Sequence, residues 1–335
     1  MATTKMAHEA AQASDGARRQ IELCRDRFAA LASRLRASPP PVIVTCARGS
    51  SDHAATFGKY VLETSVGRVV ASVGPSVAST YHQSLALDGA LFIAVSQSGR
   101  SPDLLRLSEA ARAGGALTVA MVNDEASPLA ATCDVLIPLC AGAETAVAAT
   151  KSCLLTGVAF LQLAAAWSGA PGLVDAVARV PDALAAAAAL DWRPALTRLA
   201  SARSMFVVGR GLGFGAALEV ALKLKETSGL HAEAFSSAEV QHGPLALVGP
   251  GFPVLALVQD DATAPATREV LDRLTALDAD VLATGVDLPV VPDLPAALAP
   301  LCQLQSFYLA VPALAAARGL DPDLPPNLTK VTETL

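Results

Sequence analysis

Short apolar runs rich in β-branched residues recur along the chain, and each is followed by a polar or Gly-rich turn and often by a helical pattern. Such runs cover residues 42–46, 91–95 and 117–122, and a further run in the second half of the chain covers residues 205–208. Strands that alternate with helices are typical of a mostly parallel sheet with helices on both faces. The sequence therefore predicts an α/β fold of doubly wound parallel sheets in three layers.

The two halves of the chain align with each other at a constant offset. Residues 62–65 (LETS) match residues 225–228 (KETS), which gives an offset of 163 residues (226 minus 63). At the same offset the apolar run ending at Val95 falls on Val258. We infer an internal duplication, with two tandem domains of the same fold.

The domain boundaries follow from this repeat. We predict one long helix over residues 5–38, because its apolar residues share one face and the prolines at 39–41 end it. Helices are also expected around 147–168 and 173–201. The predicted parts are an N-terminal helical segment, a first domain, linking helices, a second domain and a C-terminal tail, at residues 1–40, 41–172, 173–202, 203–317 and 318–335.

Composition narrows the class of protein. The 335 residues carry a net charge of −6 and no Lys/Arg-rich tract, so a nucleic-acid partner is not expected. The six cysteines show no metal-ligand spacing, which favours reduced thiols in a cytoplasmic protein. No apolar signal core follows the N-terminus, and the alanine-rich run at 152–168 predicts a buried helix, not a membrane span.

Two hydroxyl-rich turns lie at the predicted carboxyl ends of strands and open helices. They contain Ser50 and Ser51 in the first turn, and Ser96, Gln97, Ser98 and Ser101 in the second. Helix N-termini attract anions, so these residues are candidates for binding a phosphate. The alternative is that the serines are ordinary N-caps.

The equivalent position in the second half has a different chemistry. Residues 259–262 read QDDA where the first half has SQSG. Two carboxylates at this position would repel a phosphate. We therefore expect only the first half to bind the anion.

The serine turns and several later segments resemble those of a known protein family. The SQSG turn with Ser101 and Asp103 resembles the phosphate loop of sugar isomerase (SIS) domains, and residues 143–151, which include Val147, resemble the segment lining their sugar site. Segments 223–226, 231–234, 241–247 and 327–332 resemble the isomerase half of glutamine–fructose-6-phosphate transaminase. The resemblance covers the chain from about residue 40 onward and implies that Val147 and Thr329 contact a sugar phosphate.

Several positions depart from the transaminase. That enzyme carries a glutaminase domain with an N-terminal cysteine nucleophile, whereas residue 2 here is Ala and the first cysteine is Cys24. Asp52, Arg100 and the segment 122–125 are instead similar to SIS-type glucosamine-6-phosphate deaminases. This resemblance implies a stand-alone tandem-domain enzyme.

Three residues are candidates for catalysis. The resemblance places Glu226 as the base that moves a proton between C1 and C2 of the sugar, although a solvated carboxylate paired with Lys223 or Lys225 is the alternative. His242 is the candidate for opening the sugar ring, and the alternative is a structural histidine. Lys330 is the candidate for contacting the open-chain carbonyl, and the alternative is a frayed terminus.

Other expectations concern support and assembly. Glu219 and Lys223 lie four residues apart on one helix, so we expect them to pair and support the site. His231 and Glu233 alternate on a predicted strand, but a third ligand is missing, so neither a metal nor another cofactor is expected. In the transaminase the histidine that matches His242 reaches the neighbouring subunit, which implies a homodimer with shared active sites.

The sequence thus favours a deaminating aldose–ketose isomerase that converts glucosamine 6-phosphate into fructose 6-phosphate and ammonia. Two alternatives share its chemistry, a galactosamine-6-phosphate deaminase and a fructosamine-6-phosphate deglycase. A third alternative is a non-catalytic sugar-phosphate sensor. A sensor has no need of Glu226, His242 and Lys330 together.

Overall fold

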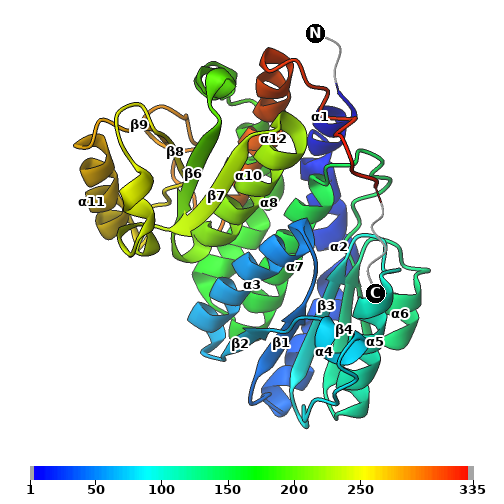
Figure 1. The fold of residues 1–335 in the computed structure, drawn as a ribbon. Coiled ribbons are helices and arrows are strands. Elements are labelled where there is room, and N and C mark those ends of the chain that lie inside the picture. The colour runs from blue at the N-terminus through cyan, green and yellow to red at the C-terminus, as the bar shows by residue number, and fades with distance from the viewer. Residues whose placement is uncertain (1–3, 331–335) are drawn as a thin grey trace. The chain divides into compact units, whose positions relative to one another are not determined.

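The computed structural model describes residues 4–330, and the backbone divides into two compact units. The first, called here the N-terminal unit, contains residues 15–144 and 151–180 together with Thr329 and Lys330. The second, the C-terminal unit, contains the residues up to Ser14, the segment 145–150 and residues 181–328. Each unit is built on one parallel sheet (Figure 1).

Strands and helices alternate along most of the chain, as the sequence pattern predicts. Up to residue 188 they are α1 (Lys5–Ala10), α2 (Ala13–Ala37), β1 (Ile43–Cys46), α3 (Ser50–Val66), β2 (Val70–Ser72), α4 (Ser76–Ser79), β3 (Leu91–Ser96), α5 (Pro102–Ala113), β4 (Leu117–Val122), α6 (Pro128–Thr132), β5 (Val135–Pro138), α7 (Lys151–Ser168) and α8 (Pro171–Ala188). Beyond it they are α9 (Arg193–Thr197), the 3₁₀ turn η1 (Arg198–Ser201), β6 (Ser204–Gly209), η2 (Gly211–Gly213), α10 (Phe214–Ser228), β7 (His231–Ser236), η3 (Glu239–Gln241), η4 (Pro244–Leu247), β8 (Pro253–Ala256), α11 (Ala264–Thr275), β9 (Asp280–Ala283) and α12 (Ala299–Ala317).

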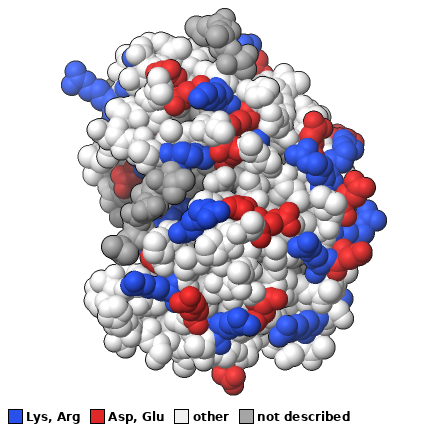
Figure 2. Space-filling model, turned by 90° about the vertical axis from the view of Figure 1, so that its right-hand side faces the viewer, with Lys and Arg blue, Asp and Glu red and all other residues white. Residues whose placement is uncertain are grey.

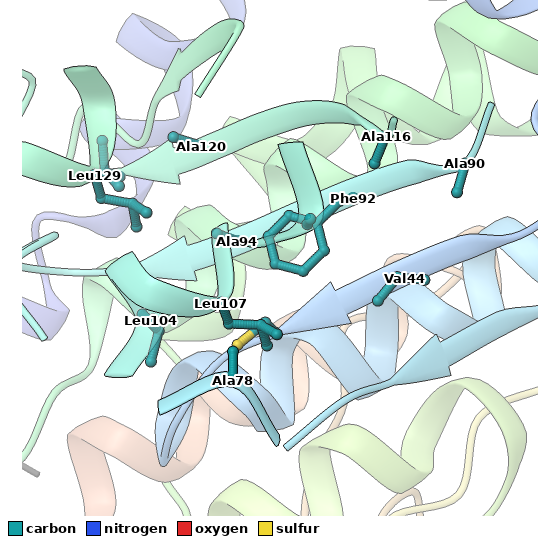
Figure 3. Packing of buried hydrophobic residues seen from close by; sticks show 13 residues of the cluster. Val44, Ala78, Ala90, Phe92, Ala94, Leu104, Leu107, Ala116, Ala120 and Leu129 are labelled. Carbon is teal, nitrogen blue, oxygen red and sulfur yellow. The ribbon is translucent and has the colours of Figure 1, made fainter. Parts of the chain in front are cut away.

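The sheet of the N-terminal unit has the order β2-β1-β3-β4-β5, and every pair is parallel. Alternate side chains, among them Val44, Phe92 and Ala120, form one buried cluster with Leu107 of α5 and Leu129 of α6 (Figure 3). The residues between them along the strands are buried as well, because helices also cover the opposite face. Burial on both faces explains why these strands read as continuous apolar runs.

Helices α3 and α7 pack against each other at close range in this unit. A Cβ atom added at Gly58 of α3 would lie 2.3–2.5 Å from ring atoms of Phe160 on α7. No side chain larger than hydrogen fits at that distance without movement of the ring or the helix. The glycine therefore sets how closely the two helices approach.

The sheet of the C-terminal unit has the order β7-β6-β8-β9 and is also parallel throughout. Phe206, Val254 and Ala283 on one face pack with Val270 and Leu274 of α11. Helices α10 and α12 pack against each other in the same unit. The unit thus has the same layered architecture as the first.

The internal duplication predicted from the sequence is confirmed by the topology. Strands β7-β6-β8-β9 follow the same order as β2-β1-β3-β4, and β5 is additional in the first sheet. Adding 163 to the bounds of β1 gives 206–209, which lies within β6, and adding it to α5 gives 265–276, which overlaps α11. The α/β fold of two parallel sheets is therefore as predicted.

Two helices that were predicted to be continuous are interrupted in the structure. The helix expected over 5–38 is interrupted at Ala11 and Gln12, where Gln12 N donates to Glu9 O at 3.1 Å. This i→i+3 bond breaks the regular α-helical ladder. The helix expected over 173–201 is divided into α8, α9 and η1, and the one expected from residue 147 begins at Lys151.

The distribution of surface charge and the apolarity of the helices were compared with what nucleic-acid binding and membrane insertion require. Figure 2 shows Lys and Arg side chains interspersed with Asp and Glu side chains on the face that it presents. Among residues 4–330 we find no helix that combines the length and the apolarity required to cross a membrane.

Candidate functional site

The two hydroxyl-rich turns lie at the carboxyl ends of neighbouring strands of the N-terminal unit. Strands β1 and β3 pair directly, and the turns that follow them lead into α3 and α5. Helix α3 has Gly49 as its N-cap and α5 has Ser101, and neither cap makes a side-chain hydrogen bond to the helix. No serine of these turns therefore caps its helix through a side-chain hydrogen bond, although Ser101 occupies the N-cap position of α5.

The turn after β3 is held by hydrogen bonds within the turn. Ser96 Oγ accepts from Gly99 N at 2.9 Å, and Ser98 Oγ accepts from Arg100 N at 3.4 Å. Gly99 has φ of +63°, and a Cβ atom there would lie 2.2 Å from Ser127 Oγ. The turn thus requires glycine for its backbone conformation and for its close contact.

The turn after β1 leaves its hydroxyls open. Within the described residues, neither Ser50 Oγ nor Ser51 Oγ makes a hydrogen bond to the protein, and both residues are only partly buried. The Gln97 side chain at the other turn is likewise without a protein partner there and partly exposed. These groups are available to donate to a ligand.

An ion pair that the sequence analysis did not single out joins the two turns. Arg48 of the first turn donates to Asp103 Oδ2 from Nη2 at 2.6 Å and from Nε at 3.2 Å. Burial alone raises the pKa of Asp103, but hydrogen bonds from Arg48 and from Ser101 outweigh it and hold that pKa below its ordinary value. The Arg48 side chain remains half exposed, so its guanidinium also places positive charge beside the serines.

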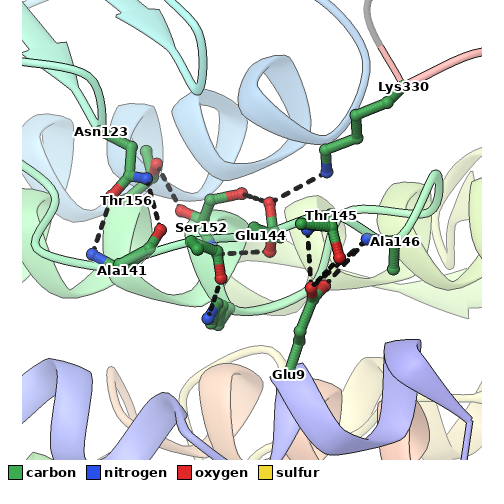
Figure 4. Close-up of polar contacts among 12 residues, drawn as sticks. Glu9, Asn123, Ala141, Glu144, Thr145, Ala146, Ser152, Thr156 and Lys330 are labelled. Atoms are coloured by element: carbon green, nitrogen blue, oxygen red, sulfur yellow. Dashed lines mark hydrogen bonds and ion pairs between the residues drawn. The ribbon is translucent and has the colours of Figure 1, made fainter.

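A buried carboxylate organises the segment after β5. Glu144 accepts from Ser152 N at 3.1 Å and from Ser152 Oγ at 2.6 Å, at the first turn of α7 (Figure 4). Its Oε2 also lies 3.4 Å from Lys330 Nζ. Lys330 is thus paired with a buried acid. From the sequence, Glu144 was covered only by the segment 143–151, because nothing in the local pattern shows that it is buried.

Neighbouring parts of the same segment are also clamped. Asn123, after β4, donates to Gly142 O and accepts from Ala141 N, both at 2.8 Å. In the C-terminal unit, Glu9 of α1 accepts from Thr145 N at 2.6 Å and from Thr145 Oγ1 at 2.9 Å. Glu9 and Asn123 were not recognised as supporting residues from sequence.

The remaining residues predicted to bind substrate are placed as follows. Val147 is half-buried in the segment 145–150, which Glu9 anchors. Thr329 is exposed next to Lys330. Ser101 donates to Asp103 Oδ1 at 2.9 Å.

The C-terminal unit contains a buried lysine between two carboxylates. Lys223 is inaccessible to solvent on α10, and its Nζ lies 3.4 Å from Glu219 Oε1 and is hydrogen-bonded to Glu226 Oε2. Tyr308 of α12 donates to Glu219 Oε1 at 2.9 Å. The predicted pairing of Glu219 with Lys223 is therefore confirmed.

This arrangement gives Glu226 a defined orientation. The pairing of Glu226 with Lys223 is the contact expected of a structural carboxylate, but the Glu226 side chain remains 20% exposed. Lys223 is itself paired with the buried Glu219, so its ammonium group stays in the interior beside Glu226. A carboxylate fixed in this way and still accessible is suited to proton transfer.

His242 makes no side-chain hydrogen bond to Glu219, Lys223 or Glu226. It follows η3, is exposed, and its ring makes no hydrogen bond to the described residues. His231 and Glu233 lie on β7, as predicted, and both are exposed. In the described part of the chain no group of three or more His, Cys, Asp or Glu side chains is arranged to hold a metal ion.

The position in the second half that corresponds to the serine turn is filled by a side chain. Gln259 is buried and donates to Arg210 O at 2.8 Å and to Asp261 Oδ2 at 2.9 Å. A Cβ atom at Gly213, beside the start of α10, would lie 2.5 Å from Gln259 Oε1. The amide thus occupies the space in front of the helix.

Comparison with known proteins agrees with this geometry. The sequence matches the SIS domain family over residues 39–166 and 198–284. The chain belongs to the SIS domain family. The first matched segment contains the serine turns, and the second contains Glu219, Lys223 and Glu226.

Two kinds of relative share this SIS architecture. Glutamine–fructose-6-phosphate aminotransferase (isomerizing) from Symbiobacterium thermophilum is 34% identical over 89% of this chain, and the match covers 52% of that enzyme. The chain thus spans about half the length of the curated relatives it matches. A crystal structure described as a candidate phosphosugar isomerase from Silicibacter pomeroyi is 42% identical, with a TM-score of 0.90 over 96% of this chain and 100% of that one.

A third comparison concerns the fold alone. The crystal structure of glucosamine-6-phosphate deaminase from Thermotoga maritima has a TM-score of 0.80 over 99% of this chain and 100% of that one, at 22% identity. The tandem SIS arrangement of parallel sheets is therefore common to both.

Proposed function

We propose that this SIS protein is an enzyme that converts glucosamine 6-phosphate and water into fructose 6-phosphate and ammonia. The observation that carries the proposal is the Glu226 carboxylate, which buried Lys223 orients and which solvent can still reach. An aldose–ketose conversion requires a base that removes a proton from C2 and returns it to C1. A sensor that only binds its ligand needs no such group.

The serine turns support a phosphate ester as the ligand. They offer open hydroxyls on Ser50 and Ser51, the N-termini of two long helices and the half-exposed guanidinium of Arg48. Helix N-termini and arginine both stabilise phosphate. The aminotransferase and phosphosugar isomerase relatives are named for sugar phosphates, in agreement with this choice.

The chemistry assigns one role to each candidate residue. His242 carries a proton from the C1 hydroxyl to the ring oxygen, which opens the pyranose. Glu226 then moves the proton from C2 to C1 while O1 gains a proton and the nitrogen loses one, so that C1 becomes a hydroxymethyl group and the C2 amine becomes an imine. Water adds to C2 and ammonia leaves, which gives the ketose, and the Lys330 ammonium polarises the group on C2.

The assembly proposed here is a homodimer. His242 is exposed and its ring has no partner in the described residues, in keeping with a histidine that serves a neighbouring subunit. Sedimentation analysis of the purified protein tests this, and a strictly monomeric active enzyme would contradict it.

The decisive experiment follows ammonia and fructose 6-phosphate together, with glucosamine 6-phosphate as the substrate and no glutamine. We expect both products in equal amounts. Glu226→Gln should bind the substrate and lower kcat by at least about a hundredfold. Glu269→Gln, an exposed acid on α11, serves as the matched control and should keep wild-type kcat.

The other outcomes separate the alternatives. Turnover of galactosamine 6-phosphate or fructosamine 6-phosphate, and not of glucosamine 6-phosphate, would replace the substrate but keep the chemistry. Binding of all three without turnover would identify a sensor and overturn the proposal. Full activity of Glu226→Gln would show that another group is the base.

A further inference from the structure

Helix α2 lies along the end of β5 in the N-terminal unit. Gln20 Nε2 donates to Leu139 O at 3.0 Å in the interior. Residues four apart lie on one helix face, so Cys24 follows Gln20 along the same segment. The Cys24 Sγ lies 3.5 Å from Pro138 O, and the residue is inaccessible to solvent. The packing of the helix against the strand therefore fixes the position of the Cys24 thiol.

A second thiol lies at the same carbonyl oxygen. Cys140 Sγ is 3.7 Å from Pro138 O, and the Cys24 and Cys140 side chains are also hydrogen-bonded to each other. Cys140 has φ of +57°, which is uncommon for a residue other than glycine. Arg19 Nη2 donates to Cys140 O at 3.2 Å and helps to hold this conformation. Two thiols that are 116 residues apart in the sequence (140 minus 24) thus meet in the folded chain.

The two thiols differ in access and in acidity. Cys24 is fully buried, whereas Cys140 is partly exposed. The hydrogen bond from Cys24 lowers the pKa of Cys140, and Arg19 and Arg27 add to this effect against burial and the Glu125 carboxylate. The same hydrogen bond, together with burial, raises the pKa of Cys24. An accessible thiolate beside a second thiol is the arrangement typical of cysteines that react with oxidants.

We propose that Cys140 is a site of oxidation by peroxides, and that Cys24 converts the oxidised Cys140 into an intramolecular disulfide. Cys140 is the residue attacked because it is the partly exposed member of the pair. Cys24 is the resolving residue because its sulfur already contacts that of Cys140. This chemistry is independent of the activity proposed above, since it needs neither a sugar phosphate nor Glu226.

The reaction has two steps. The Cys140 thiolate attacks one oxygen of hydrogen peroxide, so an S–O bond forms, the O–O bond breaks, and the departing hydroxide takes a proton from solvent to become water. The sulfur is thereby oxidised to a sulfenic acid and the peroxide is reduced. The Cys24 sulfur then attacks the Cys140 sulfur, so an S–S bond forms and the S–O bond breaks. The second hydroxide leaves with the proton of Cys24 as water.

Peptide mass spectrometry of the folded, full-length chain tests this after exposure to hydrogen peroxide at pH 7.5, with the remaining thiols blocked before digestion. We expect a peptide pair linked through Cys24 and Cys140, and its loss on reduction with dithiothreitol. Cys133 is the matched comparison, because it is also partly exposed but burial raises its pKa to about 11. Cys140 should be oxidised at least about tenfold faster than Cys133, since the thiolate is the reactive form. Cys133→Ser should form the same linked pair at the wild-type rate.

Two variants separate the roles of the thiols. In Cys24→Ala, oxidation of Cys140 should be slower and should stop at the sulfenic acid, which dimedone traps, with no linked peptide. In Cys140→Ala, the buried Cys24 should stay reduced under the same conditions. The wild-type protein decides the matter even if a variant fails to fold. The proposal is overturned if the wild type gives no Cys24–Cys140 linkage, if the linkage forms only after unfolding in urea, or if Cys133 is oxidised as fast as Cys140.

Discussion

Arg48 binds the buried carboxylate of Asp103, and this pair ties the turn after β1 to the first turn of α5. The pair joins the two turns whose hydroxyls are proposed to bind phosphate. Its two members differ in exposure, since Arg48 is half exposed and Asp103 is almost fully buried. The carboxylate accepts hydrogen bonds from the arginine, from Ser101 and from the backbone N–H of Leu104.

Asp103→Asn should lower the free energy of unfolding by roughly 1–3 kcal/mol at neutral pH, because hydrogen bonds to a charged group are lost. The pKa of Asp103 is lower in the folded protein than its ordinary value near 3.9. Its contribution to stability is therefore complete above the unfolded pKa and is lost as the pH falls through the folded pKa. Denaturant titrations of both proteins between pH 7 and pH 3 should show the difference shrinking towards acid.

Asp124→Asn provides the control for this comparison. Asp124 pairs with Arg100 at 2.8 Å, but both side chains are exposed. Exposed pairs contribute little, so the change should be below about 1 kcal/mol. Equal effects of the two substitutions would contradict the role assigned to Asp103.

Lys223→Met should destabilise the protein by roughly 3–5 kcal/mol, because removing the cation leaves two neighbouring carboxylates, one of them fully buried, uncompensated. Lys225→Met, two residues along the same helix, changes an exposed side chain and should have an effect within about 0.5 kcal/mol. Thermal and urea unfolding would measure both. A similar loss for the two variants would show that burial of Lys223 is not what matters.

Gly58→Ala should destabilise the protein by about 1–3 kcal/mol through overpacking against Phe160, despite the higher helix propensity of alanine. Gly172→Ala in α8 is the matched control, since a Cβ atom there meets nothing within 4 Å and should leave stability unchanged or slightly higher. Adding Phe160→Leu to Gly58→Ala should recover part of the loss. If Gly58→Ala unfolds at the wild-type urea concentration, the close approach of α3 and α7 is not limiting.

Cys140 should be the thiol that iodoacetamide modifies before Cys46 and Cys133. A hydrogen bond from Cys24 lowers the pKa of Cys140, with Arg19 and Arg27 adding to the effect against burial. Burial raises the pKa of Cys46 to about 12 and that of Cys133 to about 11. Because the thiolate is the reactive form, a time course read by peptide mass spectrometry at pH 7.5 should show this order.

The thiol pair itself can be tested with one substitution. Cys24→Ala removes the hydrogen bond that stabilises the Cys140 thiolate, and should slow modification of Cys140. Unchanged modification would mean that the arginines alone set its reactivity.

Much of the fold could be predicted because local pattern and tertiary role agree. The runs at 42–46 and 91–95 are buried on both faces, so their apolar continuity shows directly in the sequence. The duplication was visible because matching turns and helices recur after 163 residues, and the second sheet repeats the strand order of the first. The break at Ala11 and Gln12 was not visible, since both residues are compatible with a continuous helix.

The site was less predictable, because burial of charge is decided by distant residues. The spacing of Lys223 and Glu226 is the same whether the pair is solvated or buried. In the structure Lys223 is buried beside Glu219, which is hydrogen-bonded to Tyr308, 89 residues further along the chain. Glu144 is likewise defined as a buried, paired carboxylate only by its contacts with Ser152 and with Lys330 near the end of the chain. No local signal marks these partners.

The Gln259 side chain has a consequence for how a duplicated fold diverges. One amide group fills the place in front of α10 that the serine turn leaves accessible at α3, while the strands and helix around it keep their order. The two copies thus differ in side chains in front of this helix while the shared strands keep the same order. Shortening Gln259 would vacate the space in front of α10, and replacing Asp260 and Asp261 would remove the carboxylates that repel an anion there.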